Sequence, residues 1–102
     1  MLAQQYAQQY KQQEILSATP EELILKLYEL GLQACARQDR EKLRGVLREL
    51  INSLDFTYAE QAQTLFHLYM YCLHQTHQGR YEAVRDILTE LRETWRTHVL
   101  GK

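Results

Sequence analysis

At 102 residues, the chain is long enough for one domain with one hydrophobic core, and this length argues against a second domain. Its composition, 45% hydrophobic and 25% charged, is typical of a folded globular protein and argues against a disordered chain. A net charge of −1 removes any general electrostatic case for nucleic-acid binding, and no apolar run approaches the roughly 18 residues of a membrane-spanning helix.

The first 16 residues are rich in glutamine and carry two tyrosines about one helical turn apart, Tyr6 and Tyr10. Few apolar side chains are available to hold this segment against a core, so we expect a short mobile or weakly helical N-terminal segment. Residues 1–13 also lack the basic and then apolar pattern of a signal peptide, which indicates a cytoplasmic protein.

The strongest local pattern begins at Thr19 and predicts the start of the first bundle helix. Thr19 is a good N-cap residue, Pro20 suits the first helical position, and Glu22 stands where it can complete a capping box. A polar stretch then precedes a second helix, for which Asp39 is the expected cap. A second capping box, Thr57 with Glu60, predicts the start of a third helix.

Apolar residues recur at three-and-four spacing in each of these helices and in a fourth, after the left-handed stop expected at Gly79. In the first helix these are Leu23, Leu27, Leu30 and Ala34, with Ile24, Tyr28 and Cys35 at the margin. In the second they are Leu43, Val46, Leu47, Leu50, Ile51 and Leu54. In the fourth they are Tyr81, Val84, Ile87, Leu88, Leu91, Trp95 and Val99. The pattern predicts an all-α fold, an antiparallel up-and-down four-helix bundle over residues 20–102, in a single domain of residues 1–102.

The third helix contains the segment LFHLYMYCL, residues 65–73, which is apolar nearly all the way round. A stripe of Leu65, Phe66, Tyr69, Met70 and Leu73 is expected to face the core. Leu68, Tyr71 and Cys72 then point to the far side, where apolar surface is typical of a partner site. A helical partner segment lying in a groove is the natural occupant.

No set of residues supports catalysis or a metal site. His74 and His77 are three apart, but no carboxylate on the same helix completes a ligand set. Cys35 and Cys72 show no paired spacing, fit a reduced compartment and are expected to be small core residues. We therefore expect a protein that is not an enzyme, with no catalytic residues, no metal and no cofactor.

Four arginines lie along one side of the second helix: Arg37, Arg40, Arg44 and Arg48. Such a stripe can contact phosphates. Here the arginines are interleaved with Asp39, Glu41 and Glu49 at pairing distance, and no stacking aromatics lie between them. We expect a solvated face and no nucleic acid, although a nucleic-acid-binding bundle stays open as a poorer alternative.

Several motifs, in the same order along the chain, resemble the FliS family of flagellin export chaperones. These are the tyrosines Tyr6 and Tyr10, the run SATPEELI at residues 17–24 with LYE at 27–29, LDF at 54–56, LYMY at 68–71 and LRETW at 91–95. The region between Pro20 and Phe56 is shorter than in the family by a few helical turns.

The resemblance implies a chaperone that binds the disordered C-terminal segment of flagellin, prevents its premature polymerisation and delivers it to the flagellar type III export apparatus, with contact to the export gate. It implies that Tyr6, Tyr10 and Ile15 form a lid over the client groove when the client is absent. The expected flagellin-binding residues are Tyr6, Tyr10, Ile15, Leu65, Leu68, Tyr69, Tyr71 and Cys72. The free chain is expected to be a monomer or a homodimer, and a secretion chaperone or regulator with a different protein client stays open.

Overall fold

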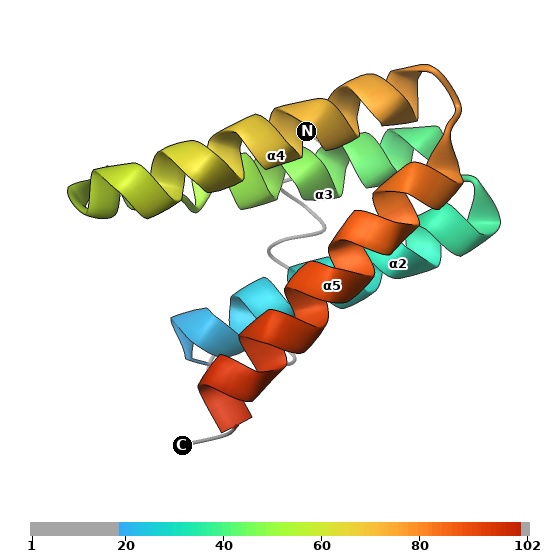
Figure 1. Cartoon of the computed structure of the whole chain (residues 1–102). Helices are drawn as coiled ribbons and strands as arrows, with labels where there is room; N and C mark the ends of the chain where they lie inside the picture. Colours follow the sequence, from blue (N-terminus) through green and yellow to red (C-terminus); the bar gives the residue numbers. More distant parts are fainter. Residues whose placement is uncertain (1–18, 101–102) are drawn as a thin grey trace.

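A computed structural model describes residues 19–100, with side chains described up to residue 98. It contains the helices α2 (Pro20–Arg37), α3 (Arg40–Asn52), α4 (Ala59–His77) and α5 (Tyr81–Leu100), and a short 3-10 helix, Phe56–Tyr58, ahead of α4 (Figure 1). The predicted all-α four-helix bundle is confirmed for this part of the chain. The expected N-terminal segment, residues 1–16, lies outside the described residues.

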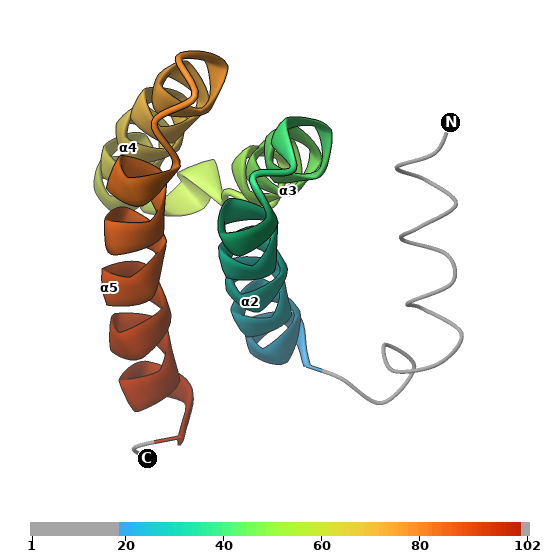
Figure 2. The ribbon, with the colours of Figure 1, turned by 90° about the vertical axis from the view of Figure 1, so that its right-hand side faces the viewer.

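The four helices form two antiparallel pairs. α2 packs beside α5 and α3 packs beside α4, and further contacts join α2 to α3 and α4 to α5. The two pairs come together where α4 passes into α5 and diverge away from that turn (Figures 1 and 2). Among the described helices, none therefore lies on the outer side of much of α4.

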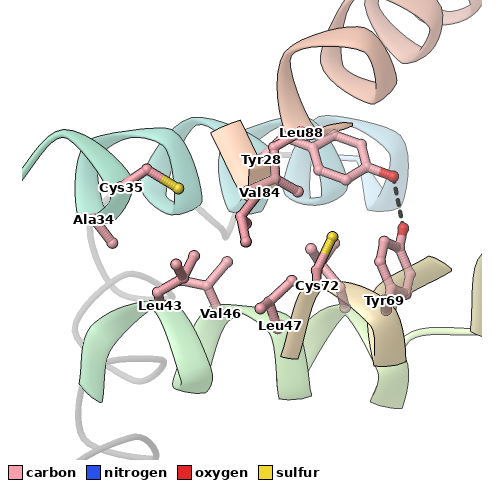
Figure 3. Packing of buried hydrophobic residues seen from close by; sticks show 11 residues of the cluster. Tyr28, Ala34, Cys35, Leu43, Val46, Leu47, Tyr69, Cys72, Val84 and Leu88 are labelled. Carbon is pink, nitrogen blue, oxygen red and sulfur yellow. Dashed lines mark hydrogen bonds between the residues drawn. The ribbon is translucent and has the colours of Figure 1, made fainter. Parts of the chain in front are cut away.

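The core lies between the pairs and is built from the apolar stripes of all four helices (Figure 3). Its buried members are Tyr28, Ala34, Cys35, Leu43, Val46, Leu47, Leu50, Tyr69, Cys72, Val84 and Leu88. The stripes predicted for the second and fourth helices are confirmed in α3 and α5. Two predicted members differ: Leu54 lies just past the end of α3, and the side chain of Val99 lies outside the described residues. In α2 the buried centre shifts from the predicted leucines to Tyr28, which is only 2% exposed.

Two of the predicted helix starts are confirmed. The Thr19 hydroxyl accepts a hydrogen bond from the Glu22 backbone N–H at 3.2 Å and donates one to the Glu22 carboxylate. The Asp39 carboxylate accepts from the Lys42 N–H at 3.1 Å, which caps α3. Each cap satisfies a backbone N–H that has no partner within the helix.

The start predicted for the third helix is wrong. Thr57 does not cap α4, which begins at Ala59 with Tyr58 as its N-cap and no side-chain cap bond. Instead, the Asp55 carboxylate accepts a hydrogen bond from the Thr57 N–H at 3.0 Å and holds the 3-10 turn. The bonds from Thr57 also hold the pKa of the Asp55 carboxyl below its ordinary value.

Two turns use left-handed backbone. Gly79 has φ +74°, as predicted for the stop after α4, and Arg80 N–H donates back to Gln75 carbonyl oxygen at 2.9 Å. α2 ends at Gln38 with φ 52°, and Asp39 N–H donates to Ala34 carbonyl oxygen at 2.9 Å. A glutamine in this conformation was not predicted, because the left-handed region normally selects glycine or asparagine.

Gly31 lets α2 approach α5 closely, and a matched pair of variants tests this. A Cβ at Gly31 would lie 2.8 Å from Leu88 Cδ1, whereas a Cβ at Gly45 on α3 would meet nothing within 4 Å. Alanine favours a helix over glycine by about 1 kcal/mol. We expect Gly45→Ala to stabilise the protein by that amount, measured by urea unfolding.

Gly31→Ala gains the same helix propensity but forces Leu88, which is fully buried, to move. Overpacking of a core costs about 1–3 kcal/mol, so we expect Gly31→Ala to lower the free energy of unfolding by about 1 kcal/mol net. Equal stabilisation by both substitutions would show that the α2–α5 contact has room for a methyl group.

The first turn of α2 is fixed to the last third of α5 by a tryptophan. The Trp95 indole N–H donates to the Glu21 carbonyl oxygen at 2.8 Å, and the Trp95 ring lies 5.8 Å from that of His98. Trp95 is half-buried and packs against the core cluster. It ties together the start of one helix and the end of another.

Candidate functional site

The helix α4 contributes both to the core and to the surface. Its buried residues are Ala62, Tyr69, Cys72, Gln75 and Thr76. The Thr76 hydroxyl donates to the Cys72 carbonyl oxygen at 2.8 Å, so this buried polar group is satisfied within the helix. Because the segment at residues 65–73 is apolar on most sides, its remaining apolar residues face away from the core.

Four large apolar side chains stand out as exposed in the described part of the chain: Phe56 at 56%, Tyr58 at 66%, Met70 at 44% and Tyr71 at 48%. All four lie in α4 or in the turn that leads into it. Scattered exposed apolar residues are ordinary, but a set gathered on one element is typical of a binding surface. We refer to Phe56, Tyr58, Met70 and Tyr71 as the α4 surface.

The apolar residues of α4 that are exposed or half-buried on its outer side occupy two flanks. Leu68 and Tyr71 are three apart and share one flank, while Phe66 and Met70 are four apart and share the other. The exposed His67 lies on the ridge between them, with its ring 5.8 Å from that of Phe66. A partner on α4 therefore meets two apolar strips separated by a polar ridge.

The structure separates the residues that were predicted for binding. Tyr71 is exposed and Leu68 is half-buried, so both are accessible from outside. Leu65 packs against the core while keeping partial exposure. Tyr69 is 2% exposed and belongs to the core.

The expected position of Cys72 on the far side of the helix is wrong. Its side chain is fully buried and lies in the core cluster. Met70, which was assigned to the core stripe, is exposed instead. The two exchange places because α4 is rotated relative to the predicted stripe, by less than the roughly 100° between successive residues.

Other residues of the expected site cannot be placed, and some surface residues were missed. Tyr6, Tyr10 and Ile15 lie outside the described residues. Phe56 and Tyr58 were not predicted as surface contacts; Phe56 was noted only within the LDF motif at residues 54–56. The available signal was an aromatic residue on each side of Thr57, in a turn with no apolar periodicity to bury them.

A buried polar contact between side chains in the core joins α2 to α4. The hydroxyls of Tyr28 and Tyr69 are 2.6 Å apart and share one hydrogen bond, as Figure 3 shows. Burial raises the pKa of both phenols, and for Tyr69 the neighbouring Tyr28 raises it further. Both groups are neutral in the folded protein, and the bond fixes one helix pair against the other.

The two cysteines are free and buried. Burial raises the pKa of the Cys35 thiol to about 11 and that of Cys72 to about 12. The folded state therefore favours the protonated thiols. Their contribution to the free energy of unfolding is fully present below pH 9.0, the ordinary pKa of a thiol, and is lost as the pH rises toward 11–12. Thiolate is the reactive form, so both side chains are poor nucleophiles.

We expect both thiols to resist iodoacetamide at about pH 8 in the folded protein, with alkylation at least about a hundredfold slower than in urea. Mass spectrometry after timed quenching measures the rate at each cysteine. Rapid labelling of Cys72 in the native protein would contradict its burial and restore it to the accessible surface.

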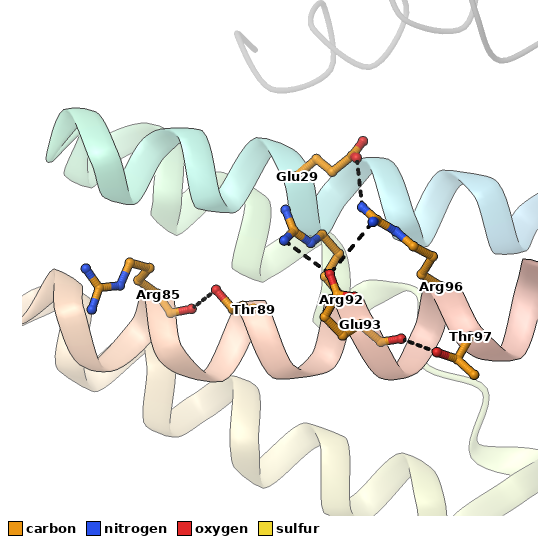
Figure 4. Close-up of polar contacts among 7 residues, drawn as sticks. All are labelled: Glu29, Arg85, Thr89, Arg92, Glu93, Arg96 and Thr97. Atoms are coloured by element: carbon orange, nitrogen blue, oxygen red, sulfur yellow. Dashed lines mark hydrogen bonds and ion pairs between the residues drawn. The ribbon is translucent and has the colours of Figure 1, made fainter.

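An ion-pair cluster lies along the contact of α2 and α5 (Figure 4). Arg92 is 3.2 Å from Glu93, and Arg96 bridges Glu93 at 3.8 Å and Glu29 at 4.0 Å. Beside it is a shallow hollow of about 480 Å³, lined by Lys26, Glu29, Leu30, Leu32, Gln33, Ala36 and Arg92. Of the residues predicted for binding that the structure describes, none lines this hollow.

Three arginines of the predicted stripe, Arg40, Arg44 and Arg48, lie on α3 and are interleaved with acids; Arg37, which was expected on the second helix, is instead the last residue of α2. Arg44 lies 3.4 Å from Glu41, and Arg37, Arg40 and Arg48 are exposed. Among the described residues, no group of three or more His, Cys, Asp or Glu is arranged to hold a metal ion. Within the same part of the chain, no helix combines the length and apolarity needed to cross a membrane.

Comparison with known proteins gives one match. No curated protein and no solved structure matches the chain. The family model described as "Flagellar protein FliS" matches residues 34–100, which include α3, α4 and α5. The match covers about two thirds of the 102 residues and contains the whole α4 surface. The chain therefore belongs to the FliS family, a family of flagellar export chaperones that are not enzymes.

Proposed function

We propose that this protein binds the disordered C-terminal segment of flagellin in the cytoplasm, prevents its premature polymerisation and delivers it to the flagellar type III export apparatus. The observation that carries the proposal is the α4 surface, within the region that matches the FliS family. A helix that presents apolar side chains on two outer flanks offers a client segment a larger apolar contact area than one flank alone.

The physical chemistry of such a client favours a surface of this kind. A disordered segment that folds on binding loses conformational entropy, so it needs a long apolar surface in compensation. From Tyr58 to Tyr71 the α4 surface extends for about 20 Å at 1.5 Å per residue. That length accommodates several turns of a client helix, with Leu68 and Tyr71 on one flank and Phe66 and Met70 on the other.

The contribution of the N-terminal segment belongs to the same proposal. Tyr6, Tyr10 and Ile15, in the FliS-like lid, are displaced by the client, and competition with the lid lowers the apparent affinity. Deletion of residues 1–14 is then expected to leave the client affinity unchanged or to increase it. A large loss of affinity on deletion would assign the segment to the binding site instead.

Isothermal titration of the full chain with the C-terminal segment of flagellin from the same genome tests the proposal. We expect one-to-one binding with a dissociation constant below about 1 μM and a negative heat-capacity change, the mark of apolar burial. Absence of heat at two temperatures would reject flagellin as the client.

A further inference from the structure

The α4 surface lies in a part of the chain that contains no lysine or arginine. Residues 49–79 carry three carboxylates, Glu49, Asp55 and Glu60, and no lysine or arginine; histidines are left out of this formal charge. This stretch therefore has a formal charge of −3, against −1 for the whole chain, which leaves +2 for the remaining residues. This stretch of the chain is thus acidic, whereas the charges of the remaining residues are close to balanced.

The three carboxylates gather at one end of the α4 surface. Glu49 is in the last turn of α3, Asp55 precedes the 3-10 turn, and Glu60 is in the first turn of α4, all of them exposed. Phe56 and Tyr58, the two most exposed of the large apolar residues, lie in the same short connection. Figure 1 shows this end of the bundle where α3 passes into α4, away from the turn between α4 and α5.

The opposite end of the α4 surface has a different character. Met70 and Tyr71 lie about 15 Å along the helix from Glu60, beside His67 and His74 and with no carboxylate between. The surface therefore has carboxylates beside its apolar side chains at one end and no carboxylate at the other. A partner with an even charge distribution would leave one of these ends unmatched.

Aromatic faces and carboxylates together favour a cation. A lysine or arginine beside Phe56 or Tyr58 gains from the ring quadrupole as well as from the neighbouring carboxylates. Hydrogen bonds from Thr57 keep Asp55 ionised, so the negative charge at this end persists to lower pH than an ordinary aspartate would allow.

We propose that the α4 surface binds an amphipathic protein segment whose apolar side chains lie along Met70 and Tyr71 and whose lysine or arginine residues meet the Phe56–Tyr58 end. This inference rests on the proposed function in taking the α4 surface as the client site, and it adds the charge and the orientation of the client. Apolar burial alone would not make the surface prefer a client with positive charges over one with negative charges.

The charge argument also separates this partner from two others. A second copy of the chain packed face to face would bring two stretches of charge −3 together, which is unfavourable. Residues 1–18 of the chain carry one lysine and one glutamate, Lys11 and Glu14, so their side chains offer no net positive charge. A basic external segment complements the surface better than either.

Two synthetic peptides of about 20 residues test the inference, long enough to form a helix on binding. Both carry the same leucine stripe; one has lysines and the other has glutamates on its polar face. We expect the full chain to bind the lysine peptide about tenfold more tightly at about 50 mM salt, with the ratio approaching one at about 500 mM. Equal affinities at low salt, or tighter binding of the glutamate peptide, would overturn the inference.

A charge reversal at one end of the surface locates the effect. We expect Glu60→Lys to reduce the preference for the lysine peptide by at least about threefold, and the matched variant Glu90→Lys, exposed on α5, to leave it within about 1.5-fold of the parent. Circular dichroism checks that both variants remain helical. An equal loss in the two variants would reject the α4 surface as the source of the preference.

The flagellin titration distinguishes the two proposals. If the lysine peptide is preferred but the flagellin segment does not bind, the charge inference stands and flagellin is rejected as the client. If flagellin binds and the two peptides bind equally, the proposed function stands and the charge inference is rejected.

Discussion

Tyr71→Asp is expected to weaken binding of the flagellin C-terminal segment by about thirtyfold. Tyr71 is 48% exposed on the outer flank of α4, next to the half-buried Leu68. A tyrosine that anchors an interface contributes about 2 kcal/mol or more to binding, which corresponds to that factor in the dissociation constant. The added carboxylate must also be desolvated under an apolar client, which increases the loss.

The effect of Tyr71→Asp is measured by isothermal titration, with circular dichroism to check that the helices persist. Thr97→Asp on α5 is the matched control, since it adds the same charge at an exposed position away from the α4 surface. We expect the control to bind within about twofold of the parent, as surface substitutions outside an interface do. Unchanged affinity for Tyr71→Asp would remove Tyr71 from the site.

Loss of either phenol of the Tyr28–Tyr69 pair is expected to lower the free energy of unfolding by about 1–3 kcal/mol. In Tyr28→Phe or Tyr69→Phe, the remaining hydroxyl stays buried and loses its partner 2.6 Å away. An unsatisfied buried hydroxyl costs more than a satisfied pair contributes. The double variant leaves no buried hydroxyl without a partner. We therefore expect its loss of unfolding free energy to be smaller than the sum of the losses in the two single variants.

Urea unfolding of the parent, both single variants and the double variant gives the coupling between the two tyrosines. A coupling of about 1 kcal/mol or more indicates that the hydrogen bond joins the two helix pairs energetically. Strict additivity would mean that each phenol finds another partner, such as water, when the other is removed. Tyr81→Phe, at a half-buried position on α5, serves as the control for loss of a phenol outside the pair.

The helices of this protein could be predicted from the sequence wherever one stripe was clearly more apolar than the rest. In α3, Leu43, Leu47 and Leu50 alternate with charged residues, and all three are fully buried. The caps at Thr19 and Asp39 were predictable because each combines a short oxygen-bearing side chain with a helical pattern after it. These features depend on neighbouring residues alone.

The orientation of α4 could not be predicted in the same way. Apolar residues lie on nearly every side of this helix. A rotation about its axis by less than the roughly 100° between successive residues therefore buries a different set of side chains that is equally apolar. The choice that buries Cys72 and exposes Met70 depends on Tyr69 meeting Tyr28, about forty residues away in sequence. That contact between helices is set by tertiary packing and not by the local sequence pattern. The pattern predicted both Tyr71 and Cys72 to face outward, which is correct for Tyr71 and wrong for Cys72.

Short connections were the other source of error. Gln38 ends α2 in left-handed backbone without a glycine, and the Asp55 bond to Thr57 replaces the capping box expected there. In both places alternative local hydrogen bonds compete within a few residues, and packing decides between them. The same connection before α4 holds Phe56 and Tyr58, so the error in its local structure concealed part of the surface.

The bond from Trp95 to the Glu21 carbonyl oxygen gives the protein a built-in optical probe. Trp95 is the only tryptophan of the chain, and its indole reports on the junction of the first turn of α2 with the end of α5. Emission from a half-buried indole shifts to longer wavelength when water reaches the ring. Detachment of the start of α2 can therefore be followed by fluorescence without a label, and a change confined to the middle of α4 leaves the signal constant.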